Sequence, residues 1–129
     1  MPSRLQRFHH SQLPHFITFT CYRRRTHLSG IAARNLFITS LERTRVLYRM
    51  RVYGYVVMPE HVHLLVSEPE RGTIANAMQS LKISSAKRCS RARGIERPRS
   101  PLWQKRYYDR NVRDYEEFIE SCATFIAIP

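Results

Sequence analysis

Two histidines stand two residues apart in the segment Glu-His-Val-His-Leu-Leu that begins at Glu60. Val62 and Leu64 alternate with His61 and His63, a pattern typical of a β-strand with one apolar face. Side chains two residues apart on a strand share a face, with Cα atoms about 6.5–7 Å apart. Two imidazoles at that spacing can share one metal ion, or they can simply be solvent-facing histidines on a half-exposed strand. Imidazole is a borderline ligand, so the spacing does not choose between zinc, manganese and magnesium.

The charge of the chain predicts a polyanionic partner. Its 129 residues carry 22 Lys and Arg against 10 Asp and Glu, a formal net charge of +12 at pH 7. Arginine supplies 19 of the 22 cations, and its planar guanidinium matches phosphate and stacks on bases. This excess favours nucleic acid as the partner and argues against an ordinary neutral metabolic enzyme.

Two groups of cations are the predicted DNA contacts, one after the first predicted strand and one along the second predicted helix. They are Arg23, Arg24, Arg25, Lys82, Lys87, Arg88, Arg91 and Arg93. Any one of them is as easily a solvated surface cation. Collectively they predict binding that weakens as salt rises.

Composition predicts one domain across residues 1–129, because 43% hydrophobic residues suffice for a single core. Cys21, Cys89 and Cys122 show no Cys-X-X-Cys spacing, which favours free thiols and a cytoplasmic protein. No apolar run approaches 18 residues, so we expect no membrane span.

The elements that position the histidine pair follow from hydrophobic periodicity. Residues 16–22, 52–58, 62–66 and 102–108 have the composition of strands. Apolar steps of three and four predict helices over 31–50 and from an N-cap at Thr73 to about Gly94, and Asp114 caps a last helix through at least Glu120. The order predicts an α+β fold, a ferredoxin-like split βαββαβ with an antiparallel sheet and a C-terminal helix. We assign Trp103 to the core rather than to base stacking.

Three blocks of the sequence resemble the single-tyrosine HUH transposases and, within them, the REP-associated tyrosine transposases of bacteria. In the family's order the blocks are His15-Phe-Ile-Thr-Phe-Thr-Cys-Tyr22, Tyr53-Gly-Tyr-Val-Val-Met-Pro-Glu-His-Val-His-Leu-Leu-Val66, and Trp103-Gln-Lys-Arg-Tyr-Tyr-Asp109 followed by Arg113. The resemblance spans about residues 5–113.

The resemblance implies a function on single-stranded DNA beside hairpins such as REP-like palindromes. The family cleaves and rejoins DNA through a 5′-phosphotyrosine intermediate. A divalent metal, Mg²⁺ or Mn²⁺, polarises the scissile phosphate, and His61 and His63 match two of its ligands. The resemblance is compatible with a monomer or a homodimer.

The family's nucleophile is missing from its expected position. Alignment on Arg113 and Pro129 places Thr124 where the family has its tyrosine, and Ile128 where it has the asparagine that completes the metal site. A threonine hydroxyl is a much poorer nucleophile and leaving group, since its pKa lies far above the roughly 10 of a phenol.

A one-base change of reading frame accounts for both missing residues. With suitable codons, one base inserted after the Glu120 codon turns residues 121–129 into Lys-Leu-Arg-Tyr-Ile-His-Arg-Asn-Pro. We therefore expect the chain from about residue 121 to be out of frame and this copy to lack strand-transfer activity.

Two classes of function remain open at this point. The first is a metal-dependent DNA transposase, and the second is a non-catalytic DNA-hairpin binder that acts as a regulator or is a transposase relic. The missing tyrosine and asparagine favour the second for this polypeptide. An RNA-binding ferredoxin-like domain is disfavoured, because the predicted strands lack the paired aromatic residues that such modules use for stacking.

Overall fold

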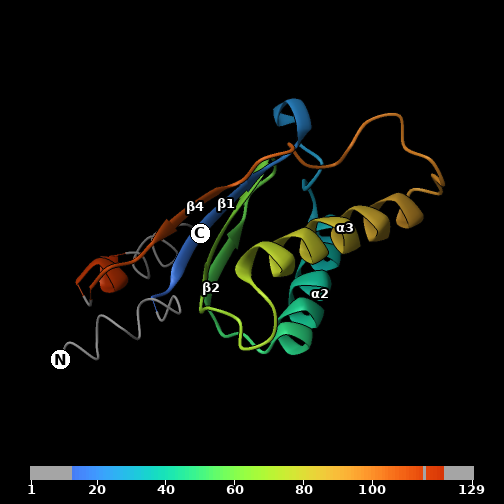
Figure 1. The fold of residues 1–129 in the computed structure, drawn as a ribbon. Helices are drawn as coiled ribbons and strands as arrows, with labels where there is room; N and C mark the ends of the chain where they lie inside the picture. The colour runs from blue at the N-terminus through green and yellow to red at the C-terminus, as the bar shows by residue number, and fades with distance from the viewer. Residues whose placement is uncertain (1–12, 115, 121–129) are drawn as a thin grey trace.

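A four-stranded antiparallel sheet, in the order β2-β3-β1-β4, organises the chain. The computed structural model describes residues 13–114 and 116–120. Its strands are β1 (His15–Thr20), β2 (Val52–Val57), β3 (His61–Val66) and β4 (Tyr108–Asn111). Helices α2 (Ile31–Tyr48) and α3 (Ile74–Ala92) cover one face of the sheet, and the short 3-10 helix η1 (Tyr22–Arg24) follows β1 (Figure 1). The predicted α+β fold with its split βαββαβ order is confirmed.

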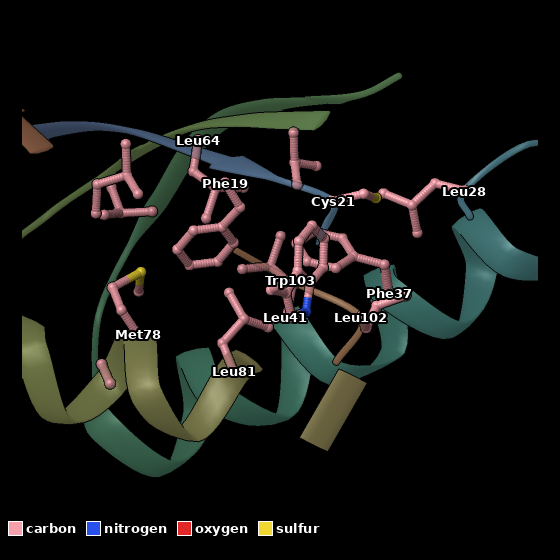
Figure 2. Packing of buried hydrophobic residues seen from close by; sticks show 14 of the residues in the cluster. Phe19, Cys21, Leu28, Phe37, Leu41, Leu64, Met78, Leu81, Leu102 and Trp103 are labelled. Atoms are coloured by element: carbon pink, nitrogen blue, oxygen red, sulfur yellow. The ribbon is translucent and has the colours of Figure 1, made fainter. Parts of the chain in front are cut away.

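The core lies between the sheet and the two helices. Strand alternation turns every second side chain of β1 and β3 toward α2 and α3. The residues that meet there include Ile17, Phe19, Val62, Leu64, Phe37, Leu41, Met78 and Leu81, all buried (Figure 2). Each such side chain contributes about 1.5–3 kcal/mol when fully buried. The other face of the sheet carries the alternate side chains of these strands, with His61 and His63 among them.

The predicted bounds of the fourth strand, residues 102–108, are wrong. Within residues 102–107, Trp103 makes only an isolated bridge, with Cys21, while the fourth strand runs from Tyr108 to Asn111 and pairs with β1. The sequence of β4, Tyr-Asp-Arg-Asn, is polar and mostly exposed, so it lacks the apolar alternation by which strands are recognised.

Trp103 belongs to the core, as predicted. Its ring packs against Phe19 and Phe37, with ring centroids 5.4 and 5.7 Å apart, and its indole N–H donates to Ser85 Oγ at 2.9 Å. Burial of the indole and not strand pairing therefore explains the bulky residues of this segment. Cys21 and Cys89 are both buried free thiols.

The predicted helix ends are close to those observed. Thr73 caps α3, because its Oγ1 accepts from the Asn76 N–H at 3.1 Å. Asp114 Oδ1 accepts from the Glu117 N–H at 2.8 Å, and residues 116–120 are helical. The predicted continuation beyond Glu120 lies outside the described residues. Within the described part of the chain, no helix combines the length and the apolar character needed to cross a membrane.

Candidate metal and nucleic-acid site

His61 and His63 lie together on the face of the sheet opposite the helices. Strand alternation places them there, because Val62 and Leu64 on either side of His63 are fully buried in the core. The two imidazole centroids are 4.8 Å apart and the rings are inclined at 74°. The Nδ1 atom of His61 is buried and has no hydrogen-bond partner among the described residues. Such an atom is energetically costly, and a bound cation is one way to satisfy it.

Thr18 orients the second imidazole of the pair. It stands opposite His63 in the register of β1 and β3, and its Oγ1 lies 2.9 Å from His63 Nδ1. When Nδ1 carries the proton and donates to this hydroxyl, Nε2 keeps its lone pair for a ligand. Burial, and secondarily the charge of His61, lower the pKa of His63. The neutral form of the ring, which is the form that binds metals, is therefore favoured at neutral pH.

The residues present fit two coordination positions of a divalent metal. Imidazole nitrogen is a donor more typical of transition-metal ions than of Mg²⁺. No group of three or more His, Cys, Asp or Glu side chains in residues 13–114 and 116–120 is placed to hold a metal. Ile128, which the sequence predicts at the family's third ligand position, lies outside the described residues, and its hydrocarbon side chain has no donor atom. The histidine pair is thus a partial ligand set.

The cations Arg23, Arg24 and Arg25 gather at the same end of the sheet as the histidine pair. Thr20, the last residue of β1, pairs with His61, and the three arginines follow within five residues, all exposed. Arg23 and Arg24 have φ angles of 55° and 54°, a left-handed conformation uncommon for residues other than glycine. This strained turn therefore presents exposed positive charge beside the candidate metal site.

Three of the five cations predicted to contact DNA along α3 and at its end also form hydrogen bonds within the protein. Lys82 Nζ donates to two backbone carbonyls of the segment after α3, each at 2.8 Å. Arg88 Nε donates to Ser40 Oγ of α2 at 3.0 Å, and Arg93 donates to the carbonyl of His27 at 3.2 Å. Lys87, Arg91 and Arg93 are exposed, whereas Lys82 and Arg88 are half-buried.

Comparison with known proteins supplies the family. A family profile described as "Transposase IS200 like" matches residues 9–121 of the chain. The chain belongs to the IS200-like transposase family. The match covers both histidines of the pair and all three sequence blocks quoted above, so the predicted family is confirmed. No curated protein sequence matches the chain.

Two solved structures share the fold of this IS200-like chain. A REP-associated tyrosine transposase bound to a REP hairpin superposes with a TM-score of 0.68 at 16% identity, over 88% of this chain and 64% of that one. A putative transposase from Deinococcus radiodurans R1 superposes with a TM-score of 0.66 at 22% identity, over 88% of each chain. The present chain thus spans less than two thirds of the first of these proteins. At such identities the likeness shows a common fold.

The sequence pattern missed a buried histidine of this family member. His15 begins β1, and its Nδ1 lies 2.8 Å from a carboxylate oxygen of Asp109 in β4, while its Nε2 lies 2.5 Å from one of Glu68, just after β3. Burial lowers the pKa of His15, but the hydrogen bonds and charges of the two carboxylates outweigh it and raise the pKa above 6.5. The partners are 94 and 53 residues away in sequence, so no local spacing signals them.

Proposed function

We propose that this chain binds single-stranded DNA that contains a hairpin and holds a divalent metal ion through His61 and His63. The buried Nδ1 of His61, unpartnered among the described residues and next to a second imidazole on the sheet face opposite the helices, carries the proposal. Membership of the IS200-like transposase family supports it. So does the likeness to a transposase bound to a REP hairpin. Bound there, Mg²⁺ or Mn²⁺ supplies Lewis-acid stabilisation of phosphate charge.

The protein's own residues divide the work of binding in this proposal. His61 and His63 provide nitrogen ligands, and Thr18 keeps the His63 ring in one orientation. The exposed Arg23, Arg24 and Arg25 lie beside the path of a DNA backbone that approaches the histidine pair. They neutralise the phosphates of that backbone. With a net charge of +12, the affinity for DNA falls steeply as salt rises.

We further propose that the chain as it stands does not form the family's phosphotyrosine. Thr124 and Ile128 occupy the positions of the tyrosine and the asparagine. The family match ends at residue 121, where the change of frame is placed, and this supports the proposal. The function of this polypeptide is then DNA-hairpin binding without strand transfer. The transposase reaction is that of the family to which it belongs.

A gel assay tests both parts of the proposal. A labelled single-stranded hairpin from the flanks of the gene is incubated with Mn²⁺ and one of three proteins. Each mixture is then resolved on a native gel and on a denaturing gel. The proteins are the chain itself, the chain with residues 121–129 replaced by Lys-Leu-Arg-Tyr-Ile-His-Arg-Asn-Pro, and the same replacement with Phe in place of Tyr. We expect salt-sensitive binding by all three and a covalent adduct only with the tyrosine-containing ending.

Two results would contradict this proposal, each in a different part. An adduct formed by the chain itself and lost in His61→Ala would show that another tyrosine attacks, and the loss of the nucleophile would be wrong. An absence of hairpin binding by all three proteins at low salt would refute the DNA-binding function.

Metal binding is measured separately, through the electron paramagnetic resonance signal of free Mn²⁺. Loss of an outer-shell partner lowers metal affinity roughly 10–100-fold. We expect His61→Ala and His63→Ala, which each remove a ligand, to lower the Mn²⁺ affinity by at least as much. His27→Ala is the matched control, since His27 lies beside Arg93 and not on the sheet face that carries the histidine pair. An equal loss in His27→Ala would contradict the assignment of the ligands.

A further inference from the structure

A groove lies on the helix side of the sheet, away from the histidine pair. It has a volume of about 940 Å³ and runs between α3 and residues 95–107, the long connection that leaves α3 and returns to β4 (Figure 1). Apolar and aromatic side chains form most of its wall. They include Ile83, Ala86, Ile95, Pro98, Pro101 and Tyr107. A groove of this size and lining accommodates a flat apolar ring.

Every charged side chain that lines the groove is basic. The cations are Lys82, Arg93, Arg97, Arg99 and Lys105, and no Asp or Glu is among the described residues that line it. An occupant that matches this lining carries negative charge next to an apolar face. A nucleotide of single-stranded DNA has both features, because its base stacks on apolar and aromatic surfaces while its phosphates pair with cations.

The wall of the groove is held in place before any ligand binds. Lys82 Nζ donates to the carbonyls of Gln104 and Lys105, and it also lies 5.9 Å from the centre of the Tyr107 ring. The Trp103 N–H is already satisfied by Ser85. The half-buried Tyr107 ring is therefore a fixed aromatic surface for a base, and little ordering is needed on binding.

The groove and the histidine pair lie on opposite faces of the sheet, but both reach the same end of β1. The Gln104 N–H donates to the carbonyl of Thr20 at 2.9 Å, and Thr20 pairs with His61 on its other side. The arginines at 23–25 follow directly after this point of the chain. A DNA strand with one nucleotide in the groove can thus run past these arginines toward the histidine pair.

We propose that the groove between α3 and residues 95–107 binds one unpaired base of single-stranded DNA, whose phosphates pair with cations of its rim such as Arg97 and Arg99. The proposal rests on the DNA-binding function proposed above. It adds a subsite for a base that is separate from the histidine pair.

Matched substitutions in the groove and on α2 test the proposal. Ile83→Glu and Ile95→Glu place a carboxylate in it at positions 48% and 42% exposed, so the fold tolerates both changes. Leu47→Glu and Val46→Glu make the same kind of change on α2, at positions 51% and 60% exposed outside the groove. Binding of a fluorescein-labelled single-stranded DNA is measured by anisotropy, with the intact strand and with strands that lack one base at each position in turn.

The groove predicts a dependence on one particular base. The unsubstituted protein loses about tenfold in affinity when that base is absent, the scale of one stacked base. Ile83→Glu and Ile95→Glu each bind the intact strand about tenfold more weakly than the unsubstituted protein does. Removal of the base from the strand does not lower their affinity further. The two α2 variants behave like the unsubstituted protein, apart from a change of about twofold from their added charge.

Three other outcomes would each overturn a stated part of the proposal. Equal binding by groove and α2 variants, with no base position that matters, refutes the base subsite and leaves DNA binding intact. A labelled peptide of alternating Glu and Phe is the second probe. If it binds the unsubstituted protein but not Ile95→Glu, and DNA binds both proteins equally, the occupant is an acidic peptide and not a base. Failure of the unsubstituted protein to bind any strand refutes the DNA-binding function itself.

Discussion

The ligand capacity of the histidine pair depends on the position of a single proton. His63 offers Nε2 to a metal only when its other nitrogen carries the hydrogen, and Thr18 Oγ1, 2.9 Å from Nδ1, is placed to accept that hydrogen. Phe16 packs against the same ring, with centroids 5.7 Å apart. Thr18 is therefore a positioning residue, which acts on a metal through the ring it orients.

Thr18→Val removes the acceptor and keeps the shape of the side chain. We expect the Mn²⁺ affinity to fall about 10–100-fold, the usual effect of removing an outer-shell partner, while the thermal midpoint of unfolding changes little. Thr18→Ser restores the hydroxyl and is expected to restore the affinity.

Thr20→Val is the matched control for this prediction. Thr20 lies on the same face of β1 and pairs with His61, but its side chain makes no hydrogen bond to either histidine within the described chain. If Thr20→Val weakened Mn²⁺ binding as much as Thr18→Val, orientation of His63 would not be the cause.

Small hydroxyl side chains of α2 and α3 are buried without losing their hydrogen bonds. Ser40, Thr44 and Ser85 are buried, and each donates to a backbone carbonyl of its own helix, at 3.2, 2.9 and 2.7 Å. Because these hydroxyls satisfy their own hydrogen bonds, they can be buried between the helices at little cost. Leu47, which the apolar periodicity groups with the core face of α2, is 51% exposed.

The start of α3 depends on its capping residue. Thr73→Ala removes the acceptor for the Asn76 N–H, and we expect the free energy of unfolding to fall by about 1 kcal/mol. Urea denaturation with a common m-value measures it. Thr73→Ser keeps the hydroxyl and is expected to lose much less, so an equal loss in both variants would show that the methyl group and not the cap matters.

At the scale of the whole molecule, His15 joins three parts of the sheet. It lies at the start of β1, contacts Asp109 of β4 and reaches Glu68 beyond the end of β3. Protonated, it pairs with both carboxylates in a buried setting. Deprotonated, it leaves the two carboxylates sharing a neutral ring. The attachment of β4 to the sheet is therefore sensitive to pH.

The sign of this sensitivity follows from the raised pKa of His15 in the fold. A group whose pKa rises on folding stabilises the folded state fully below its unfolded pKa of about 6.5, and this contribution is lost as pH rises through the folded value. We expect the difference in free energy of unfolding between the unsubstituted protein and His15→Gln to be largest in mildly acidic solution and to shrink as pH rises.

The comparison with His15→Gln is needed because other histidines titrate in the opposite sense. Burial lowers the pKa of both His27 and His63, so their contributions grow as pH rises, but they are common to both proteins. Urea denaturation at several pH values supplies the differences. A difference that stays constant with pH, or that grows as pH rises, would contradict a stabilising interaction between protonated His15 and its two carboxylates.

The sequence alone determined the features that depend on neighbours in the chain. Strand alternation placed His61 and His63 on one face, the apolar steps located α2 and α3, and Thr73 marked the start of a helix. These signals are local, because a strand repeats every two residues and a helix about every 3.6, and a cap reaches only three residues ahead. The sequence blocks also identified the family, which the profile match confirmed.

Only the tertiary structure decided the features that depend on distant partners. β4 is a strand because β1 offers it hydrogen bonds, although its own residues are polar and carry no alternation. Lys82, Arg88 and Arg93 form hydrogen bonds with other elements, which no count of cations along a helix reveals. The raised pKa of His15 is caused by carboxylates 53 and 94 residues away. Folding brings such groups into contact, and their chemistry follows from that proximity.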